Sequence, residues 1–216
     1  MTETRGFVLF GDVVRSRTDA PAATAWLREL IAELERTYTP EERLATFAFT
    51  QGDELQGLLR PTADPFLAVL RGTLSDHAQP MRWAIVAGSI EPGRGPATER
   101  TGPAFLAARE LLDTARARRE GLLVRVEEER ADALLAGLAP LLADLLDDLT
   151  DRQRSIARLM LVEGLRQSEV AERLGVSRAT ISVMAERARI RRIEELLGVL
   201  RRLVRDAVEG AGEDPR

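Results

Sequence analysis

Residues 6–13, G-F-V-L-F-G-D-V, form a short apolar run that ends with a carboxylate at Asp12. A run of this length, rich in aromatic and β-branched side chains, is typical of a buried β-strand. A second Gly-Asp pair, Gly52-Asp53, separates the alternating run 44–50 from the run 54–59, which predicts a β-hairpin. The two carboxylates are therefore expected at the ends of neighbouring strands.

The segments around these strands alternate between helix and strand patterns. Apolar residues recur at helical spacing in 20–37, 63–76 and 102–118, and strand-like runs cover 81–90 and 121–126. The predicted order is β-α-β-β-α-β followed by α-β, the split βαβ pattern of a ferredoxin-like α+β fold. We expect an antiparallel sheet with helices on one face, and a Leu/Ala-rich helix at 128–148 that leads into an all-α C-terminal part with a long last helix.

The composition is that of a globular protein, with 44% hydrophobic and 31% charged residues among 216. No apolar run approaches the roughly 18 residues of a membrane span. The N-terminus also lacks a signal-peptide pattern, so we expect a cytoplasmic protein without membrane contact. Cysteine is absent and His77 is the single histidine, which excludes disulfides, thiolate metal sites and His-based triads.

Charge is distributed unevenly, and arginine supplies all 31 basic residues. Residues 1–149 hold 17 arginines and 24 acidic residues, a net charge of −7, whereas residues 152–205 hold 13 and 6, a net charge of +7. This asymmetry predicts two modules, of which the C-terminal one suits a polyanion. The predicted units are a domain at 1–127, a linker helix at 128–149, a helical module at 150–208 and a flexible tail at 209–216.

The C-terminal module starts with a helix-capping pattern and continues with two short helices. Thr150 and Gln153 have the spacing of a capping box, and helix patterns at 167–174 and 178–187 are separated by G-V-S. Gly175 suits a tight turn and Ser177 can cap the second helix, which is a helix-turn-helix arrangement with the small Ala171 at the contact. The expected core residues are Val170, Leu174, Val176 and Ile181.

The stretch L-T-D-R-Q-R-S-I-A-R-L-M-L-V-E-G-L-R-Q-S-E-V-A-E-R-L-G-V-S-R-A-T-I-S at 149–182 resembles the helix-turn-helix of sigma-factor region 4 and of related response-regulator domains. The resemblance implies double-stranded DNA as a partner, and also RNA polymerase, which sigma-like modules contact. Arg178 is expected to read a guanine, and the later arginines are expected to contact phosphates. The alternative is an Arg-rich three-helix bundle that binds a protein. The predicted DNA contacts are Ser177, Arg178, Ala179, Thr180, Ser182, Val183, Arg187 and Arg189.

The helix pattern continues after Arg189 with apolar residues at steps of three and four: Ile190, Ile193, Leu197, Leu200, Val204 and Ala207. This spacing is an a/d seam over nearly three heptads. Such a seam can pack on its own domain or on a second copy of the chain. Since helix-turn-helix proteins generally bind DNA as two-fold dimers, we expect the second arrangement and therefore a homodimer.

Asp12 and Asp53 suggest a further site in the N-terminal module. Neighbouring strands lie about 4.8 Å apart, so two carboxylates can converge, and they repel unless a cation or a proton lies between them. Without Cys or His ligands, the suitable ion is a hard one held through oxygen, such as Mg²⁺, Mn²⁺ or Ca²⁺, which can also bind substrate phosphates. The alternative is that each Gly-Asp pair is only a turn.

Four segments resemble class III nucleotide cyclase domains in order and spacing: F-V-L-F-G-D-V-V-R-S-R at 7–17, F-T-Q-G-D-E-L-Q-G-L-L at 49–59, M-R-W-A-I-V-A-G-S-I at 81–90 and G-P-A-F-L-A-A-R-E-L-L-D-T-A-R at 102–116. The resemblance implies metals held by Asp12, Asp53 and the Val13 carbonyl over a nucleotide triphosphate. G-D-V-V-x-S-R, G-D-E-L-Q-G-L-L and G-P-A-F-x-x-A-R-E also resemble the SatD family, which is generally regarded as regulatory, over most of 5–127. The ligand contacts that these resemblances imply are Arg15, Ser16, Arg17, Glu54, Gln56 and Arg109.

The chain departs from active cyclases at two points. The Asn that steadies the transferring phosphoryl group falls on Phe105 or Leu106, neither of which donates a hydrogen bond, and the base-reading Lys has no counterpart. We therefore expect a DNA-binding transcriptional regulator, and not an enzyme, whose cyclase-like domain binds a metal-nucleotide (with Mg²⁺ or Mn²⁺) or related phosphate ligand without efficient turnover. The alternative is a divergent nucleotide cyclase or nucleotidyl-transfer enzyme with a DNA-targeting domain.

Overall fold

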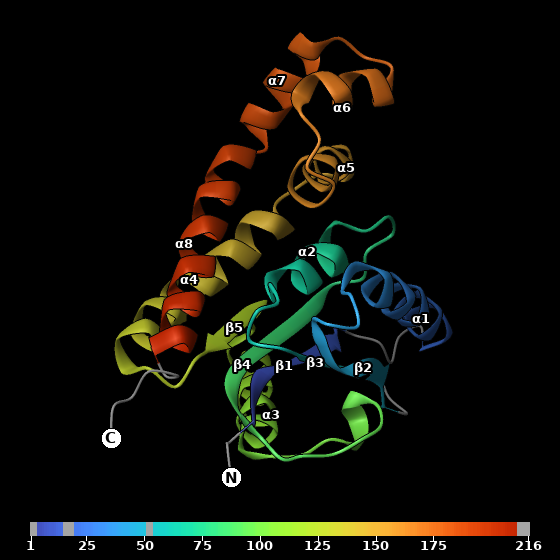
Figure 1. The fold of residues 1–216 in the computed structure, drawn as a ribbon. Coiled ribbons are helices and arrows are strands. Elements are labelled where there is room, and N and C mark those ends of the chain that lie inside the picture. Colours follow the sequence, from blue (N-terminus) through green and yellow to red (C-terminus); the bar gives the residue numbers. More distant parts are fainter. Residues whose placement is uncertain (1–3, 15–19, 51–53, 211–216) are drawn as a thin grey trace.

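The computed structural model describes residues 4–14, 20–50 and 54–210, and its elements follow the predicted order (Figure 1). The sheet consists of β1 (Thr4–Val13), β2 (Arg43–Phe49), β3 (Glu54–Leu59), β4 (Met81–Ile90) and β5 (Leu122–Arg125). The helices around it are α1 (Ala20–Thr37), α2 (Phe66–Leu74), the short 3₁₀ helix η2 (Ala97–Glu99) and α3 (Pro103–Arg118). The C-terminal helical region consists of α4 (Glu129–Asp147), α5 (Asp151–Ala157), the π-helical turn η3 (Arg158–Val162), α6 (Gln167–Leu174), α7 (Arg178–Arg187) and α8 (Ile190–Gly210). The chain is therefore a mixed α+β protein with a helical C-terminal region.

The five strands form one sheet with the order β2-β3-β1-β4-β5. β1 pairs antiparallel with both β3 and β4, and β2 pairs antiparallel with β3, which confirms the predicted hairpin strands. β5 extends the sheet in parallel with β4. The register places Asp12 of β1 opposite Glu54 of β3 and Arg82 of β4, so three charged side chains occupy one row across the sheet.

Helices cover both faces of the sheet, so the expectation of one covered face is wrong. On one face, Phe7 and Leu9 of β1 belong to the same apolar core as α1 and α2. On the other face, the alternate residues Val8 and Phe10 pack with α3. Because β4 and β5 are parallel, the chain must cross over between them, and α3 makes this crossover on the face opposite α1 and α2 (Figure 1).

The helix α8 runs back from the helix-turn-helix to the sheet and packs along α4 (Figure 1). The seam predicted in 190–207 lies inside this contact, because its residues Ile190, Ile193, Leu197, Leu200 and Val204 are at most 3% exposed and join the core that also contains sheet residues. The expectation that this seam pairs with a second copy is therefore wrong. The same 3-4 spacing serves packing within one chain.

The helix α4 contacts both β5 and α8, so the predicted linker also contributes to the core. The unit boundaries at 127, 149 and 208 stay predictions, and residues 211–216 of the predicted tail lie outside the described ranges. Within those ranges, no helix combines the length and the apolarity that crossing a membrane requires.

Candidate functional site

The helical region contains a helix-turn-helix built from α6 and α7. α6 ends at Gly175, whose φ of 64° lies in the left-handed region that glycine adopts at little cost. α7 begins after Ser177, whose hydroxyl accepts a hydrogen bond from the Thr180 backbone N–H at 3.1 Å. The predicted capping box is also confirmed, because the side chains of Thr150 and Gln153 accept each other's backbone N–H at the start of α5.

The residues of α7 that pack into the core determine which face of this helix is exposed. Ile181 and Ala185 of α7 are buried in the same core as Val170 and Ala171 of α6. Leu174 departs from the prediction, because it is 38% exposed and not part of the core. It is the last residue of α6, directly before the left-handed Gly175, and Val176 after the turn is half-buried and packs against the core.

All eight residues that the sequence predicts as DNA contacts are exposed: Ser177, Arg178, Ala179, Thr180, Ser182, Val183, Arg187 and Arg189. Three of them are arginines that form no ion pair with the described part of the chain. By contrast, Arg191 and Arg192 both bind Glu195 at 2.9 Å, and these hydrogen bonds lower the pKa of the Glu195 carboxyl. The free arginines can therefore meet an external anion, and DNA contact itself stays a prediction.

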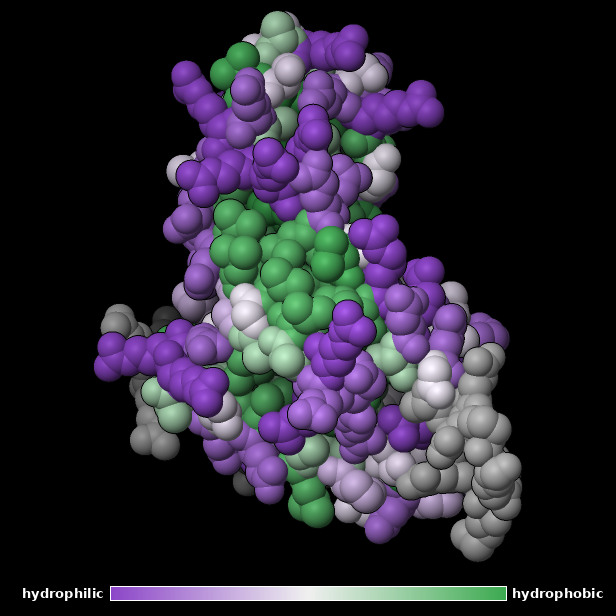
Figure 2. Space-filling view, turned by 90° about the vertical axis from the view of Figure 1, so that its left-hand side faces the viewer, coloured by the Kyte–Doolittle hydropathy of each residue, from purple (hydrophilic) through white to green (hydrophobic). Residues whose placement is uncertain are grey.

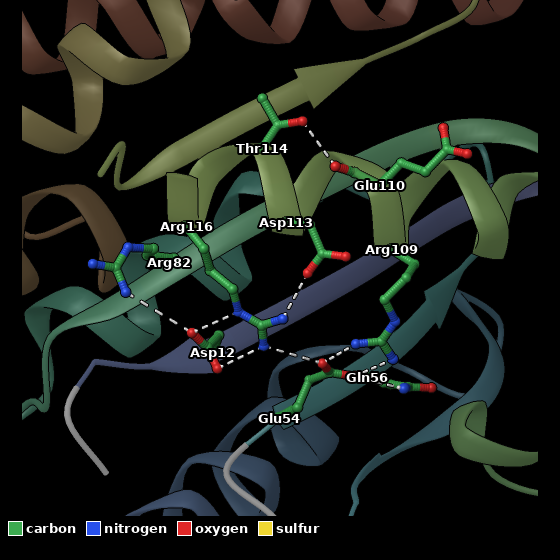
Figure 3. A network of polar contacts seen from close by, with 9 residues as sticks. All are labelled: Asp12, Glu54, Gln56, Arg82, Arg109, Glu110, Asp113, Thr114 and Arg116. Atoms are coloured by element: carbon green, nitrogen blue, oxygen red, sulfur yellow. Dashed lines mark hydrogen bonds and ion pairs between the residues drawn. The ribbon is translucent and has the colours of Figure 1, made fainter. Parts of the chain in front are cut away.

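A second group of polar side chains lies on the sheet face beneath α3 (Figure 3). Asp12 of β1 and Glu54 and Gln56 of β3 are 8%, 6% and 6% exposed, and Gln56 Nε2 donates to Glu54 Oε1 at 2.9 Å. Phe10 and Leu58 lie on the same face of these two strands and are apolar. The three polar side chains therefore lie at one end of an otherwise apolar surface. Two neighbouring buried carboxylates need cationic partners if both are to stay charged.

Arginines of α3 supply these partners (Figure 3). Arg116 donates to Asp12 Oδ1 from Nη2 at 2.8 Å and to Oδ2 from Nε at 3.1 Å, and Nη2 also lies 3.4 Å from Glu54 Oε2. The hydrogen bond to Asp12 is the main reason that the pKa of Arg116 is raised above its usual value. Arg109, two turns earlier, holds Glu54 with both terminal nitrogens and stacks over the Phe10 ring at 4.7 Å.

Together with Arg82 of β4, these residues form what we call the carboxylate–arginine cluster: Asp12, Glu54, Gln56, Arg82, Arg109 and Arg116. The described members do not fit a divalent metal ion. Both Asp12 oxygens accept from Arg116, and Arg82 lies 3.9 Å away, so a metal at Asp12 would face two guanidinium charges. The described ranges contain no group of three or more acidic or histidine side chains that could hold a metal.

The structure describes only some of the residues in the predicted metal site. Asp53 lies outside the described residues, so its convergence with Asp12 stays a prediction, as do Mg²⁺ and Mn²⁺ as cofactors. Val13, the predicted carbonyl ligand, is buried at the end of β1. Of the predicted ligand contacts, Glu54, Gln56 and Arg109 meet in the cluster, whereas Arg15, Ser16 and Arg17 also lie outside the described residues.

The two positions where a cyclase would carry its Asn differ from each other. Phe105 is 7% exposed, and its ring lies edge-on to Phe10 with centroids 6.2 Å apart. Leu106 is 70% exposed on the outer side of α3. Neither side chain can hydrogen-bond to a ligand.

Two members of the cluster, Arg82 and Arg116, were not predicted from the sequence. The spacing of Arg109 and Arg116 was a usable signal, because residues seven apart lie two turns apart on one helix face. Asp113 binds Arg116 at 2.8 Å from the solvent side. No local pattern, however, indicates that Asp12 pairs with a residue 104 positions later.

One part of the chain matches a known protein family. Residues 145–191 match the family model of Sigma-70, region 4, a segment that contains α5, η3, α6 and α7 in full. No curated protein and no solved structure matches the chain. The resemblance of the helix-turn-helix to sigma-factor region 4 is thus confirmed, whereas the resemblance of 5–127 to cyclase domains and to the SatD family stays a prediction.

Proposed function

We propose that the chain is a DNA-binding transcription regulator with α6 and α7 as its DNA-binding unit. The observation that carries this proposal is the capped helix-turn-helix: α7 and its flanking residues expose every predicted contact, and the arginines among these contacts form no ion pairs in the described ranges. Helices of this kind enter the major groove with their N-terminal residues at the base edges. The match to Sigma-70, region 4, over the same residues supports the proposal.

The proposed contacts divide into base-reading and phosphate-binding ones. Arg178, the first residue of α7, can form two parallel hydrogen bonds with O6 and N7 of a guanine. Ser182 and Val183 lie one turn later on the exposed side and can reach further base edges. Arg187 is the last residue of α7 and Arg189 lies between α7 and α8, where phosphate contacts would give affinity that depends on salt and not on sequence.

RNA polymerase is a second proposed partner of the same module, because sigma-like modules contact polymerase as well as DNA. The exposed Leu174 at the end of α6 offers an apolar contact that phosphates do not use. Binding of purified core polymerase to the full chain, compared with binding to a Leu174→Glu variant, tests this partner separately.

Selection of duplexes from a random-sequence pool by the full chain tests DNA recognition. We expect enrichment of a defined sequence, and we expect Arg178→Ala to lose about 1–3 kcal/mol of discrimination at a single base pair. Arg118→Ala is the matched control, since it removes the same charge from an exposed position of α3, far from α7 (Figure 1). Enrichment of no sequence, or an equal effect of both variants, contradicts the proposal.

The carboxylate–arginine cluster favours a second function, the binding of a nucleotide or related phosphate ligand. The antiparallel order β2-β3-β1-β4 supports a ferredoxin-like arrangement and the proposed cyclase-like character of this part. The side chains of Arg109 and Arg116 are 43% and 36% exposed, so a phosphate can reach them by displacing part of their carboxylate contacts. Turnover is not part of this proposal, because the Asn of active cyclases falls on Phe105 or Leu106 in the resemblance, and neither side chain donates a hydrogen bond.

Thermal unfolding with inorganic phosphate, ATP or GTP, each with and without Mg²⁺, tests this second function. We expect a nucleotide to stabilise the wild-type chain and the Arg118→Gln control, but not Arg109→Gln. Stabilisation without Mg²⁺ supports a phosphate held by arginines, and no shift with any compound contradicts ligand binding. A product detected by mass spectrometry would instead establish the alternative, a divergent cyclase or nucleotidyl-transfer enzyme.

A further inference from the structure

The helix α4 carries more apolar surface than its own core covers. Residues 133–143, A-L-L-A-G-L-A-P-L-L-A, contain no charged or hydrogen-bonding side chain. One side of α4, which includes Leu135 and Leu142, is fully buried, but the other exposes 48% of Leu134 and 46% of Leu141. A helix that is apolar on all sides is normally buried, so the exposed outer side of α4 indicates a surface that packs against a partner.

Figure 2 shows that hydrophobic side chains gather in one continuous area on the side of the molecule along which α4 and α8 run, the left-hand side of Figure 1. We use the name α4–α8 face for the leucine and valine residues of these two helices that keep exposed surface in the strip 134–145 and along 196–203: Leu134, Leu138, Leu141 and Leu145 of α4 with Leu196, Val199 and Leu203 of α8. All but two of these seven side chains are half-buried, and the two helices pack on each other. Continuous exposed apolar areas of this kind mark interaction surfaces.

The spacing of the α4 leucines fits a second copy of the same helix. Leu134, Leu138, Leu141 and Leu145 follow one another at steps of 4, 3 and 4, which is the a/d spacing of a coiled coil. In an antiparallel pair, Leu134 lies opposite Leu145 of the second copy, and Leu138 lies opposite Leu141. A two-fold axis through the middle of the strip makes the contacts equivalent and closes the assembly at two chains.

Two charges at the ends of the strip fit the same arrangement. Arg130 lies one turn before Leu134, and Asp148 lies three residues after Leu145. Both are exposed, and neither side chain has an ion-pair partner within the described ranges. Antiparallel pairing brings Arg130 beside Asp148 of the second copy, twice by symmetry, whereas parallel pairing would place like charges side by side.

We propose that the α4–α8 face is the homodimer interface of this chain, with α4 of the two copies packed antiparallel. This interface replaces the buried 190–207 seam as the dimer contact. The proposal does not depend on DNA or ligand binding, because its readout is the mass of the free protein.

Sedimentation velocity of the full chain over a concentration series tests the proposal. We expect the wild type to dimerise, and Leu141→Glu to raise the dimer dissociation constant by about 30-fold or more, as for a hot-spot residue. Leu106→Glu is the matched control, because Leu106 is 70% exposed on α3 outside this face, and it should leave the dimer unchanged. Far-UV circular dichroism of each variant reports that the fold is kept, as expected for changes at exposed positions.

Charge-reversal variants test the antiparallel arrangement without disturbing the apolar strip. Arg130→Asp and Asp148→Arg alone should each weaken the dimer by about 3- to 10-fold, because like charges then face each other. The double variant should regain the wild-type dissociation constant, because the pair is only inverted. A wild type that stays monomeric at all concentrations, or a dimer that Leu141→Glu leaves intact, overturns the proposal, and a double variant weaker than both single variants overturns the antiparallel pairing.

Discussion

The ion pair between Arg116 and Asp12 provides the most quantitative test of the carboxylate–arginine cluster. Arg116→Met removes the guanidinium and keeps an unbranched side chain. Asp12, which is 8% exposed, is then left with Arg82 at 3.9 Å as its remaining cationic neighbour. Removing one partner of a buried ion pair costs about 3–5 kcal/mol, but the Arg116 side chain is 36% exposed, so we expect a smaller loss of about 2 kcal/mol in the free energy of unfolding.

The assay is a double-mutant cycle measured by urea denaturation. Asp12→Asn should cost less, about 1 kcal/mol, because the partly exposed Arg116 can regain water, and the coupling energy between the two sites should be about 1–2 kcal/mol. In thermal unfolding, the Arg116→Met loss corresponds to about 4–8 °C for a chain of this size. The control Asp113→Asn removes a 58%-exposed partner of Arg116 and should change stability by less than about 0.5 kcal/mol. A coupling energy below about 0.3 kcal/mol would refute the reasoning.

The same variants separate an ion-pair cluster from a metal site. Mg²⁺ alone should leave the unfolding temperature of the wild type unchanged, because Arg116 already holds both Asp12 oxygens. A Mg²⁺-dependent stabilisation of the wild type that Asp12→Asn abolishes would establish the metal site predicted from the sequence.

Three further substitutions test other parts of the structure. Tyr38 Oη donates to the Asp64 carbonyl at 2.7 Å and accepts from the Ala68 N–H at 3.0 Å, so Tyr38→Phe should cost about 1–2 kcal/mol in urea denaturation. Burial raises the pKa of Tyr38 well above 10.0, so the contribution of its phenol to the free energy of unfolding is complete below that pH and is lost as the pH rises above it. Tyr38→Phe should therefore reduce the loss of stability at alkaline pH, and an identical alkaline profile of the free energy of unfolding would contradict the account. Gly175→Ala should cost about 1–2 kcal/mol through the positive φ alone, because no atom lies within 4 Å of the added Cβ, and no loss would contradict the left-handed turn. In Gly57→Ala the new Cβ would overlap the Phe47 ring, so we expect a loss of about 1–3 kcal/mol, and unchanged stability would refute the close packing of β2 on β3.

The sequence predicts what local periodicity and capping determine. The apolar run 6–13, the hairpin strands around Gly52 and the Ser177 cap all follow from residues that lie close together in the chain, and the observed elements agree with them. That helices cover both faces of the sheet could not be predicted from such local patterns. The placement of α3 depends on β5 running parallel to β4, and no pattern within 121–126 encodes the direction of that strand.

Long-range pairing explains the other differences. The heptad spacing of 190–207 is the same whether the seam packs on another chain or on α4, and the structure selects α4. Asp12 was recognised as a site residue, but its chemical surroundings depend on Arg116, 104 positions away. A carboxylate has the same sequence pattern whether its partner is an arginine or a metal ion, so the ion pairs of Asp12 could not be predicted from the sequence.

The central claim, that α7 binds DNA, is tested most directly by fluorescence anisotropy of a labelled duplex titrated with the full chain at several salt concentrations. We expect the logarithm of the affinity to fall linearly with the logarithm of salt, and the slope to become shallower by about 1 for each of Arg187→Ala and Arg189→Ala. Arg118→Ala on α3 should leave the slope unchanged. Absence of binding at low salt, or a slope that Arg187→Ala and Arg189→Ala do not alter, would contradict the account.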